Sequence, residues 1–257
     1  MISRFRTFVF VAAFVAMVSP AVFAQNTTYA NRIALGVGVP AGFYLGPGVA
    51  DAWYWWYPVA GRSYCVESAV NPAYTNQYSN DTVLYVYRAD GTTLIGSNDD
   101  GSGEPTLGRG SRVCWVADSD AQVTVDLKQY GGAPAQNRYY SVRIVETTLW
   151  SSWYFVGGDY NSFLLMRNTT GSTVHFVATW RNAAGTVVGT SGTLTVPAHG
   201  GAGINAKTYI TDPVTNYNGT VDIAHAGSPD ALVGQMTSLS STTGLGFDAP
   251  LFQRKPW

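Results

Sequence analysis

Short runs of β-forming residues, separated by tight-turn residues, fill the chain from Ala52 onward. Turn pairs such as Asp90-Gly91 and Gly131-Gly132 interrupt runs that are rich in Val, Thr and aromatic residues. No stretch between Ala52 and Val145 shows the apolar stripe of an amphipathic helix. The pattern predicts an all-β fold of antiparallel sandwiches, with strands in the first half at 53–57, 64–68, 82–87, 112–116, 122–127 and 139–145.

A second series of strand-like runs begins after Glu146-Thr147-Thr148. The 257 residues are enough for two domains of ordinary size. We therefore predict two tandem sandwiches, a jelly-roll-like one over residues 25–147 and an immunoglobulin-like one over residues 148–257. The strands expected in the second are 153–156, 163–167, 173–180, 186–188, 193–196, 221–224 and 231–233.

The N-terminal segment has the features of a secretory signal peptide. Arg4 and Arg6 precede an apolar run over residues 8–18, and Val22-Phe23-Ala24 matches a signal peptidase site. The run is too short to span a bilayer as a helix and is followed by Pro20. We expect residues 1–24 to be removed and the protein to be secreted, to the periplasm or to the extracellular space.

The charge content excludes one class of partner. Charged residues make up only 12% of the chain, with 15 Lys and Arg against 16 Asp and Glu. Binding to a nucleic acid backbone needs a basic surface, which this balance does not supply. No segment after the signal peptide is long and apolar enough to span a membrane as a helix. We expect neither nucleic acid nor a membrane span.

The two cysteines, Cys65 and Cys114, each lie within a strand-like run. In an oxidising compartment such a pair is best explained as a disulfide. Closing a loop of roughly 50 residues is worth about 4 kcal/mol in the chain-entropy treatment. The sequence therefore predicts a Cys65–Cys114 bridge.

An ordered series of motifs runs through the first half: Asp51-Ala52-Trp53-Tyr54, then 59–67, 81–87, Ala89-Asp90-Gly91, Asn98-Asp99-Asp100-Gly101 and Ser111-Arg112-Val113. Together these motifs resemble the bacterial pre-peptidase C-terminal domain, over roughly residues 45–147. The resemblance implies a jelly-roll appendage of secreted peptidases and other exported proteins. The family often has two aspartates before its Trp-Tyr, whereas only Asp51 stands here. The second half resembles β-sandwich modules of exported bacterial proteins, which implies a fold but no chemistry.

Signatures of hydrolytic enzymes are missing from the sequence. It contains no Gly-x-Ser-x-Gly and no His-Glu-x-x-His motif, and a disulfide leaves no free thiol. Asp222, His225 and Ser228 are close in sequence, but residues of one strand and its turn rarely form a catalytic relay. We expect a protein that is not an enzyme.

Acidic residues in the turns of the first half suggest one cofactor. Ca²⁺ takes six to eight oxygen ligands from irregular loops, and Asp99 and Asp100, followed by Asp81, are the best candidates. The alternative is that these aspartates cap their own turns. Ca²⁺ is the only cofactor that the sequence suggests.

The run Trp53-Tyr54-Trp55-Trp56-Tyr57 is the most unusual local feature. On a strand, Trp53 and Trp55 face one side while Tyr54 and Trp56 face the other. One set must be core, and the other is either covered by the neighbouring sandwich or free to stack on a sugar or peptide. The ligand-binding candidates are Trp53 and Trp55, followed by Trp56.

These observations favour a secreted, non-catalytic binding or adhesion protein that attaches to extracellular matrix, polysaccharide or protein. Two alternatives remain open. One is a structural subunit that self-associates in an extracellular assembly through its edge strands. The other is an accessory protein of a secreted hydrolase.

Overall fold

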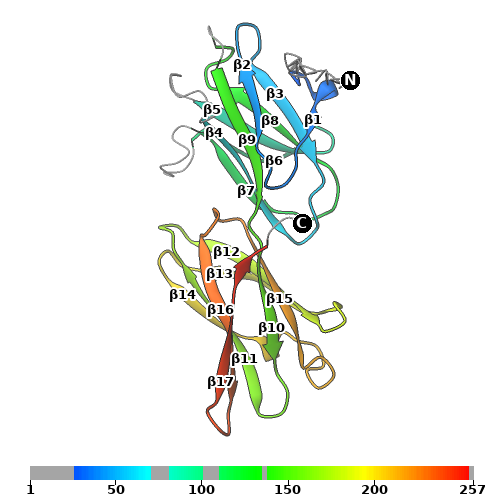
Figure 1. The fold of residues 1–257 in the computed structure, drawn as a ribbon, viewed down its shortest axis with the longest axis vertical. Helices are drawn as coiled ribbons and strands as arrows, with labels where there is room; N and C mark the ends of the chain where they lie inside the picture. The colour runs from blue at the N-terminus through cyan, green and yellow to red at the C-terminus, as the bar shows by residue number, and fades with distance from the viewer. Residues whose placement is uncertain (1–25, 71–80, 101–109, 135–137, 255–257) are drawn as a thin grey trace, which may run out of the picture.

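The computed structural model describes residues 26–70, 81–100, 110–134 and 138–254, and these residues form two β-sandwiches stacked end to end (Figure 1). The predicted all-β, antiparallel fold is confirmed. One sheet of the first sandwich has the order β1 (Ile33–Ala34), β3 (Asp51–Trp56), β8 (Val123–Gln129), β5 (Thr82–Arg88) and β6 (Leu94–Asn98). The other has the order β2 (Ala41–Leu45), β9 (Arg138–Glu146), β4 (Ser63–Val70) and β7 (Arg112–Val116).

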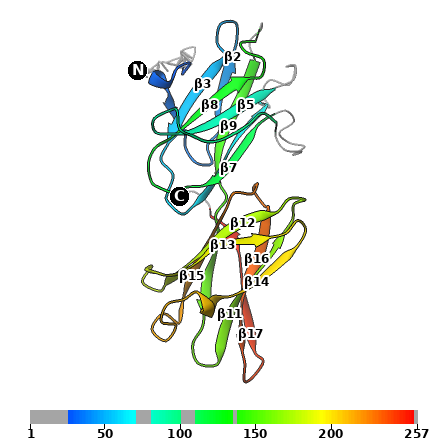
Figure 2. The same cartoon turned by 180° about the vertical axis from the view of Figure 1, so that it is seen from behind.

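The second sandwich is also made of two sheets, seen from both sides in Figures 1 and 2. Its larger sheet has the order β13 (Val187–Val196), β12 (Val174–Asn182), β15 (Asn218–His225), β10 (Leu149–Phe155) and β18 (Phe252–Gln253). The smaller has the order β14 (Gly201–Asn205), β11 (Tyr160–Asn168), β16 (Leu232–Ser240) and β17 (Gly246–Pro250). No helix among the described residues has the length and apolar character needed to cross a membrane.

Each sandwich has its own hydrophobic core. In the first, Tyr54 and Trp56 of β3 pack with Leu84, Val125 and Ile144. The strict alternation of buried and partly exposed residues along β3 explains this core, because successive side chains of a strand point to opposite faces. The second core is built around Tyr154, Leu164, Phe176, Trp180 and Ile223.

The second half departs from the expected strands in two respects. Residues 186–188 and 193–196, which we expect to be separate strands, belong to one strand, β13. The sequence does not predict the strands β14, β17 and β18. The first two are rich in small residues and carry little alternation, so they form through their pairing with β11 and β16 and not through their own propensity.

The two sandwiches are joined by a network of ion pairs around Glu146, which is buried at the end of β9. Glu146 pairs with Arg62 of the first sandwich at 3.5 Å and with Arg254 of the second at 3.9 Å. Arg254 also contacts Asp222 at 2.6 Å, and Asp222 contacts Arg181 at 3.3 Å. The connection between the sandwiches is therefore held by charged groups from both of them and is not a free linker.

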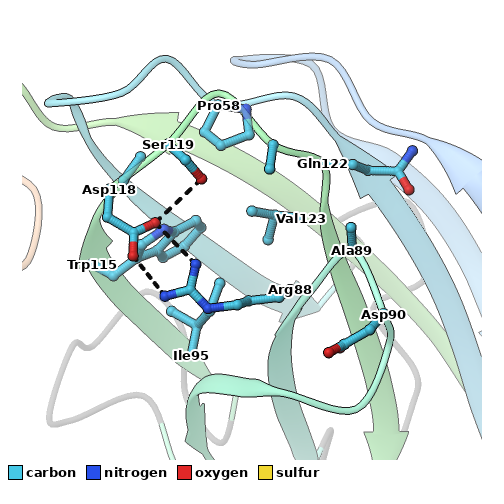
Figure 3. Close-up of a pocket in the computed structure, with 12 residues that line it drawn as sticks. Pro58, Arg88, Ala89, Asp90, Ile95, Trp115, Asp118, Ser119, Gln122 and Val123 are labelled. Carbon is cyan, nitrogen blue, oxygen red and sulfur yellow. Dashed lines mark hydrogen bonds and ion pairs between the residues drawn. The ribbon is translucent and has the colours of Figure 1, made fainter.

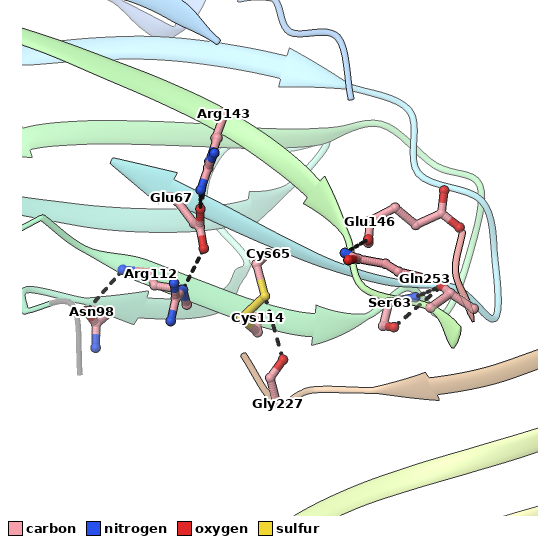
Figure 4. The surroundings of a disulfide bond; sticks show 11 residues. Ser63, Cys65, Glu67, Asn98, Arg112, Cys114, Arg143, Glu146, Gly227 and Gln253 are labelled. Carbon is pink, nitrogen blue, oxygen red and sulfur yellow. Dashed lines mark hydrogen bonds and ion pairs between the residues drawn. A yellow bond between two sulfur atoms is a disulfide. The ribbon is translucent and has the colours of Figure 1, made fainter. Parts of the chain in front are cut away.

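The predicted Cys65–Cys114 disulfide is confirmed, and it lies beside this junction (Figure 4). The two cysteines are directly paired across the antiparallel strands β4 and β7. The carbonyl oxygen of Gly227, in the second sandwich, lies 3.7 Å from the Cys65 sulfur. The disulfide thus cross-links β4 to β7, the strand that contacts β15 of the second sandwich.

Candidate functional site

The outer face of the sheet containing β3, β8 and β5 gathers aromatic side chains. Trp53 of β3 and Tyr85 of β5 are both paired with Asp126 of the central strand β8. In the next row, Trp55 and Tyr87 flank Thr124 in the same way. We call the four aromatic residues Trp53, Trp55, Tyr85 and Tyr87 the aromatic face.

The rings of Trp53, Tyr85 and Tyr87 are in contact and nearly parallel, whereas Trp55 meets Tyr57 edge-on with ring centroids 5.6 Å apart. The Trp53 and Tyr87 ring centroids are 6.1 Å apart with planes 22° from parallel. The Tyr85 and Tyr87 rings are also 6.1 Å apart, with planes inclined by 11°. Tyr29 meets Trp53 edge-on at 5.8 Å. All four rings of the face remain partly exposed, and the second sandwich approaches the first mainly at β7.

A buried charge lies beneath these rings. Asp126 is 1% exposed although it points away from the core, because the side chains of the neighbouring strands cover it. The Lys128 ammonium lies 3.1 Å from the Asp126 carboxylate and 3.4 Å from that of Asp51. Burial raises the pKa of Asp126 to about 6 despite the nearby Lys128. Burial, followed by the negative charge of Asp126, also raises the pKa of Tyr87.

The structure separates the three predicted ligand-binding residues. Trp53 and Trp55 lie on the outer face, as alternation along β3 predicts. Trp56 is only 3% exposed and packs edge-on against Trp115 in the core, with ring centroids 5.4 Å apart. The sequence did not identify Tyr85 and Tyr87 as members of the same face, although the alternating pattern of β5 carries that signal.

The predicted calcium ligands lie at one end of this sheet. Pairing of Leu84 with Asn98 puts Asp81, before β5, at the same end as Asp99 and Asp100, after β6. Within the described part of the chain, no three Asp, Glu, His or Cys residues are close enough to hold a metal ion. Gly101, which follows these aspartates, lies outside the described residues.

A cavity of about 300 Å³ opens between the two sheets of the first sandwich (Figure 3). Trp115 and Val123 are among its lining residues. Arg88 forms a two-pronged ion pair with Asp118, at 2.6 and 3.1 Å. Asp90 accepts hydrogen bonds from the Thr93 hydroxyl and from the backbone amides of Thr93 and Thr92, and these bonds lower the pKa of Asp90 to about 2. The charges of this cavity are therefore satisfied within the protein.

Asp222 and His225 belong to the junction, whereas the carbonyl of Ser228 accepts a hydrogen bond from the Ala231 amide within its own turn. Asp222 is bonded to Arg181 and Arg254. His225 is 1% exposed and lies beside the backbone of Thr147 in the connection between the sandwiches. Burial lowers the pKa of His225 to about 4, so the ring is neutral at physiological pH.

Comparison with known proteins finds only distant structural similarities. No family model and no curated protein sequence matches the chain. A solved structure of the pre-peptidase C-terminal domain of a Bacillus anthracis collagenase aligns with 44% of this chain and 91% of its own, at 11% identity and a TM-score of 0.32. The extracellular region of zebrafish Gpr126/Adgrg6 aligns with 84% of this chain but 30% of its own, at 9% identity and a TM-score of 0.25. A Bacteroides uniformis beta-glucuronidase aligns at 9% identity and a TM-score of 0.21.

At these TM-scores and identities the similarities assign neither a family nor a role, and the all-β sandwich fold is established by the strand order of the four sheets. The last two proteins are three to four times longer than the part that this chain covers, and they indicate nothing about its ligand.

Proposed function

We propose that the protein is a secreted, non-catalytic binding module that attaches to an extracellular polysaccharide through the aromatic face. One observation carries the proposal: Trp53, Tyr85 and Tyr87 present nearly parallel, partly exposed rings on one sheet face. Aromatic faces of this kind stack on the apolar faces of other rings, and large side chains with few rotatable bonds lose little entropy on binding. A sugar polymer offers such rings repeatedly.

The charges of the face favour a neutral polymer over an acidic one. Asp51, Asp126 and Lys128 together carry one net negative charge when both carboxylates are ionised. This charge lies beneath and beside the rings, where it repels an approaching polyanion. The disulfide agrees with an oxidising compartment, which is where secreted polysaccharides are found.

The proposal is tested with residues 25–257 in affinity electrophoresis, using gels that contain hydroxyethyl cellulose, xylan or polygalacturonate. We expect retardation by a neutral polymer and none by polygalacturonate. Trp53→Ala and Trp55→Ala should each weaken binding by about 2 kcal/mol, roughly thirtyfold, if the residue is a hot spot. Trp153→Ala is the matched control, because Trp153 is a partly exposed tryptophan of the second sandwich.

Two results would contradict the proposal. The first is binding that Trp153→Ala weakens as much as Trp53→Ala and Trp55→Ala. The second is mobility that no neutral polymer changes, while immobilised matrix protein such as gelatin retains the chain. The second result would indicate that the aromatic face binds a protein and not a polysaccharide.

A further inference from the structure

Figures 1 and 2 show that β10 ends and β11 begins at the end of the second sandwich that lies away from the first. A second group of aromatic rings belongs to the segments at this end. Trp153 and Phe155 come from β10, Tyr160 from the start of β11, Tyr217 from just before β15, and Phe247 from β17. Each ring contacts at least one other, with centroids 4.2 to 6.1 Å apart. Side chains dispersed over nearly a hundred residues thus form one apolar surface.

A groove of about 530 Å³ is hollowed into this surface, and we call it the distal groove. Phe155, Tyr160 and Tyr217 supply aromatic walls, and Val214 stands on its rim with 86% of its surface exposed. A contiguous exposed apolar surface on a protein of this kind marks an interaction site.

The backbone holds the groove open. The Val156 amide donates to the Tyr217 carbonyl at 2.7 Å, which ties the β10–β11 turn to the loop before β15. A side-chain carbon at Gly157 would lie 3.2 Å from the Phe155 ring and 3.3 Å from the Tyr217 Cβ. Glycine at this position therefore leaves room for the two rings to meet edge-on, at 5.8 Å.

One cation stands at the groove without an ion-pair partner among the described residues. Lys207 is exposed, and it is the single charged residue in the lining. The aspartates of the adjacent turns are engaged elsewhere: Asp159 accepts from the Ser240 hydroxyl and Asp212 accepts from the Thr215 hydroxyl at 2.6 Å. The groove therefore combines apolar walls with one accessible positive charge.

The ring orientations of the groove walls differ from those of the aromatic face, although Trp153 and Phe247, outside the groove lining, stack nearly parallel at 4.2 Å. Phe155 meets Tyr160 at 77° and Tyr217 at 82°, so these walls share no common plane. Such walls enclose a compact side chain better than they support a flat sugar ring. The lysine on the rim is complementary to a negative group next to that side chain.

We propose that the distal groove binds a protein segment that presents an aromatic or branched aliphatic side chain beside a carboxylate. The apolar side chain enters between Phe155, Tyr160 and Tyr217, and the carboxylate meets the Lys207 ammonium. This site is separate from the aromatic face, and it does not depend on polysaccharide binding there.

The test uses two small probes that differ only in charge, N-acetyltryptophan and its neutral amide, titrated into ¹⁵N-labelled protein comprising residues 25–257. Both should shift the amide signals of Gly157, Gly158 and Val214, and the carboxylate should bind about two- to fivefold more tightly, as an exposed ion pair allows. Lys207→Gln should remove that difference. Tyr217→Ala should weaken both probes.

Two substitutions of opposite charge on the rim test the role of charge in binding without altering the walls of the groove. Val214→Lys should strengthen binding of the carboxylate probe, and Val214→Asp should weaken it. Val187→Asp, at an exposed valine of β13, should leave the affinity for both probes unchanged. Equal affinity for the two probes, or shifts outside the groove, would overturn the proposal. The proposal would also be overturned if chitotriose or phosphatidylcholine micelles shifted the amide signals of the groove residues and N-acetyltryptophan did not. That result would assign the groove to a glycan or to a lipid surface.

Discussion

Asp126 lies directly across from Trp53 in the β3–β8 pair, and its carboxylate is buried 3.1 Å from the ammonium of Lys128. Burial raises the pKa of Asp126 to about 6. The native state therefore holds this proton more tightly than the unfolded chain does. The stability that results is complete below the unfolded pKa of about 3.8 and is lost as the pH rises through 6.

We expect Asp126→Asn to stabilise the first sandwich at pH 7.5 by up to about 3 kcal/mol, with the gain disappearing near pH 4. Urea unfolding at several pH values measures this. Asp51→Asn is the control, since it removes a more exposed carboxylate that lies 3.4 Å from the same lysine. A gain that is independent of pH would contradict the assignment to Asp126 ionisation.

His225 should give the second sandwich the opposite pH dependence. Burial lowers the pKa of His225 to about 4, so the unfolded chain binds a proton there at a higher pH than the native state does. The stability from the neutral ring is complete above pH 6.5 and is lost as the pH falls from 6.5 to about 4, by up to about 3 kcal/mol. His225→Gln should flatten this acid loss. His175→Gln, at an exposed histidine, should leave it unchanged.

Removing the disulfide should destabilise the first sandwich. The Cys65–Cys114 bridge spans a sequence separation of 49, for which the chain-entropy treatment gives about 4 kcal/mol. Cys65→Ala combined with Cys114→Ala should lower the unfolding midpoint of that sandwich and leave the second nearly unchanged. Finding two free thiols by mass spectrometry of the unreduced protein would contradict the bridge.

Replacing tryptophans of opposite faces of β3 should separate stability from binding. Trp56→Ala empties a core position and should cost about 3–5 kcal/mol of unfolding free energy. Trp53→Ala removes a partly exposed ring and should cost about 1 kcal/mol or less. Thermal unfolding of the two variants measures the difference. Equal losses would show that the outer ring is also structural.

We also predict that residues 25–147 and residues 148–257 each fold alone, because each contains a complete hydrophobic core. Circular dichroism during urea unfolding should show a cooperative transition for each fragment. A fragment that stays unfolded would mean that the junction is part of its core.

Part of the first sandwich is predictable from the sequence because β3, β5 and β7 alternate strictly between buried and partly exposed residues over most of their length. β3 and β5 both have one buried and one partly exposed face. The bounds that the sequence predicts for them agree with the observed bounds to within one or two residues. β8 is buried on both faces, since neighbouring aromatic side chains cover Asp126 and Thr124. That burial comes from strand order, which the sequence of β8 does not contain.

The distal groove could not be predicted from local sequence. Its aromatic walls, Phe155, Tyr160 and Tyr217, come from three segments, and Phe247 adjoins them from β17. β17 itself has the sequence Gly-Phe-Asp-Ala-Pro, in which no run of β-branched residues signals a strand. Only the pairing of β16 with β17 brings Phe247 to this end of the sandwich.

The ion pairs that join Arg62, Glu146, Arg254 and Asp222 have a consequence for avidity. With a flexible linker, the effective concentration of a second binding site follows from linker length. Here the connection is held by charged groups and by the backbone bond from Thr147 to Ser63, so geometry alone sets that concentration. If the aromatic face binds a polymer and the distal groove binds a protein, as we propose, one molecule would bridge the two targets at this fixed separation with little entropic loss. Targets at other spacings would gain nothing from the second contact.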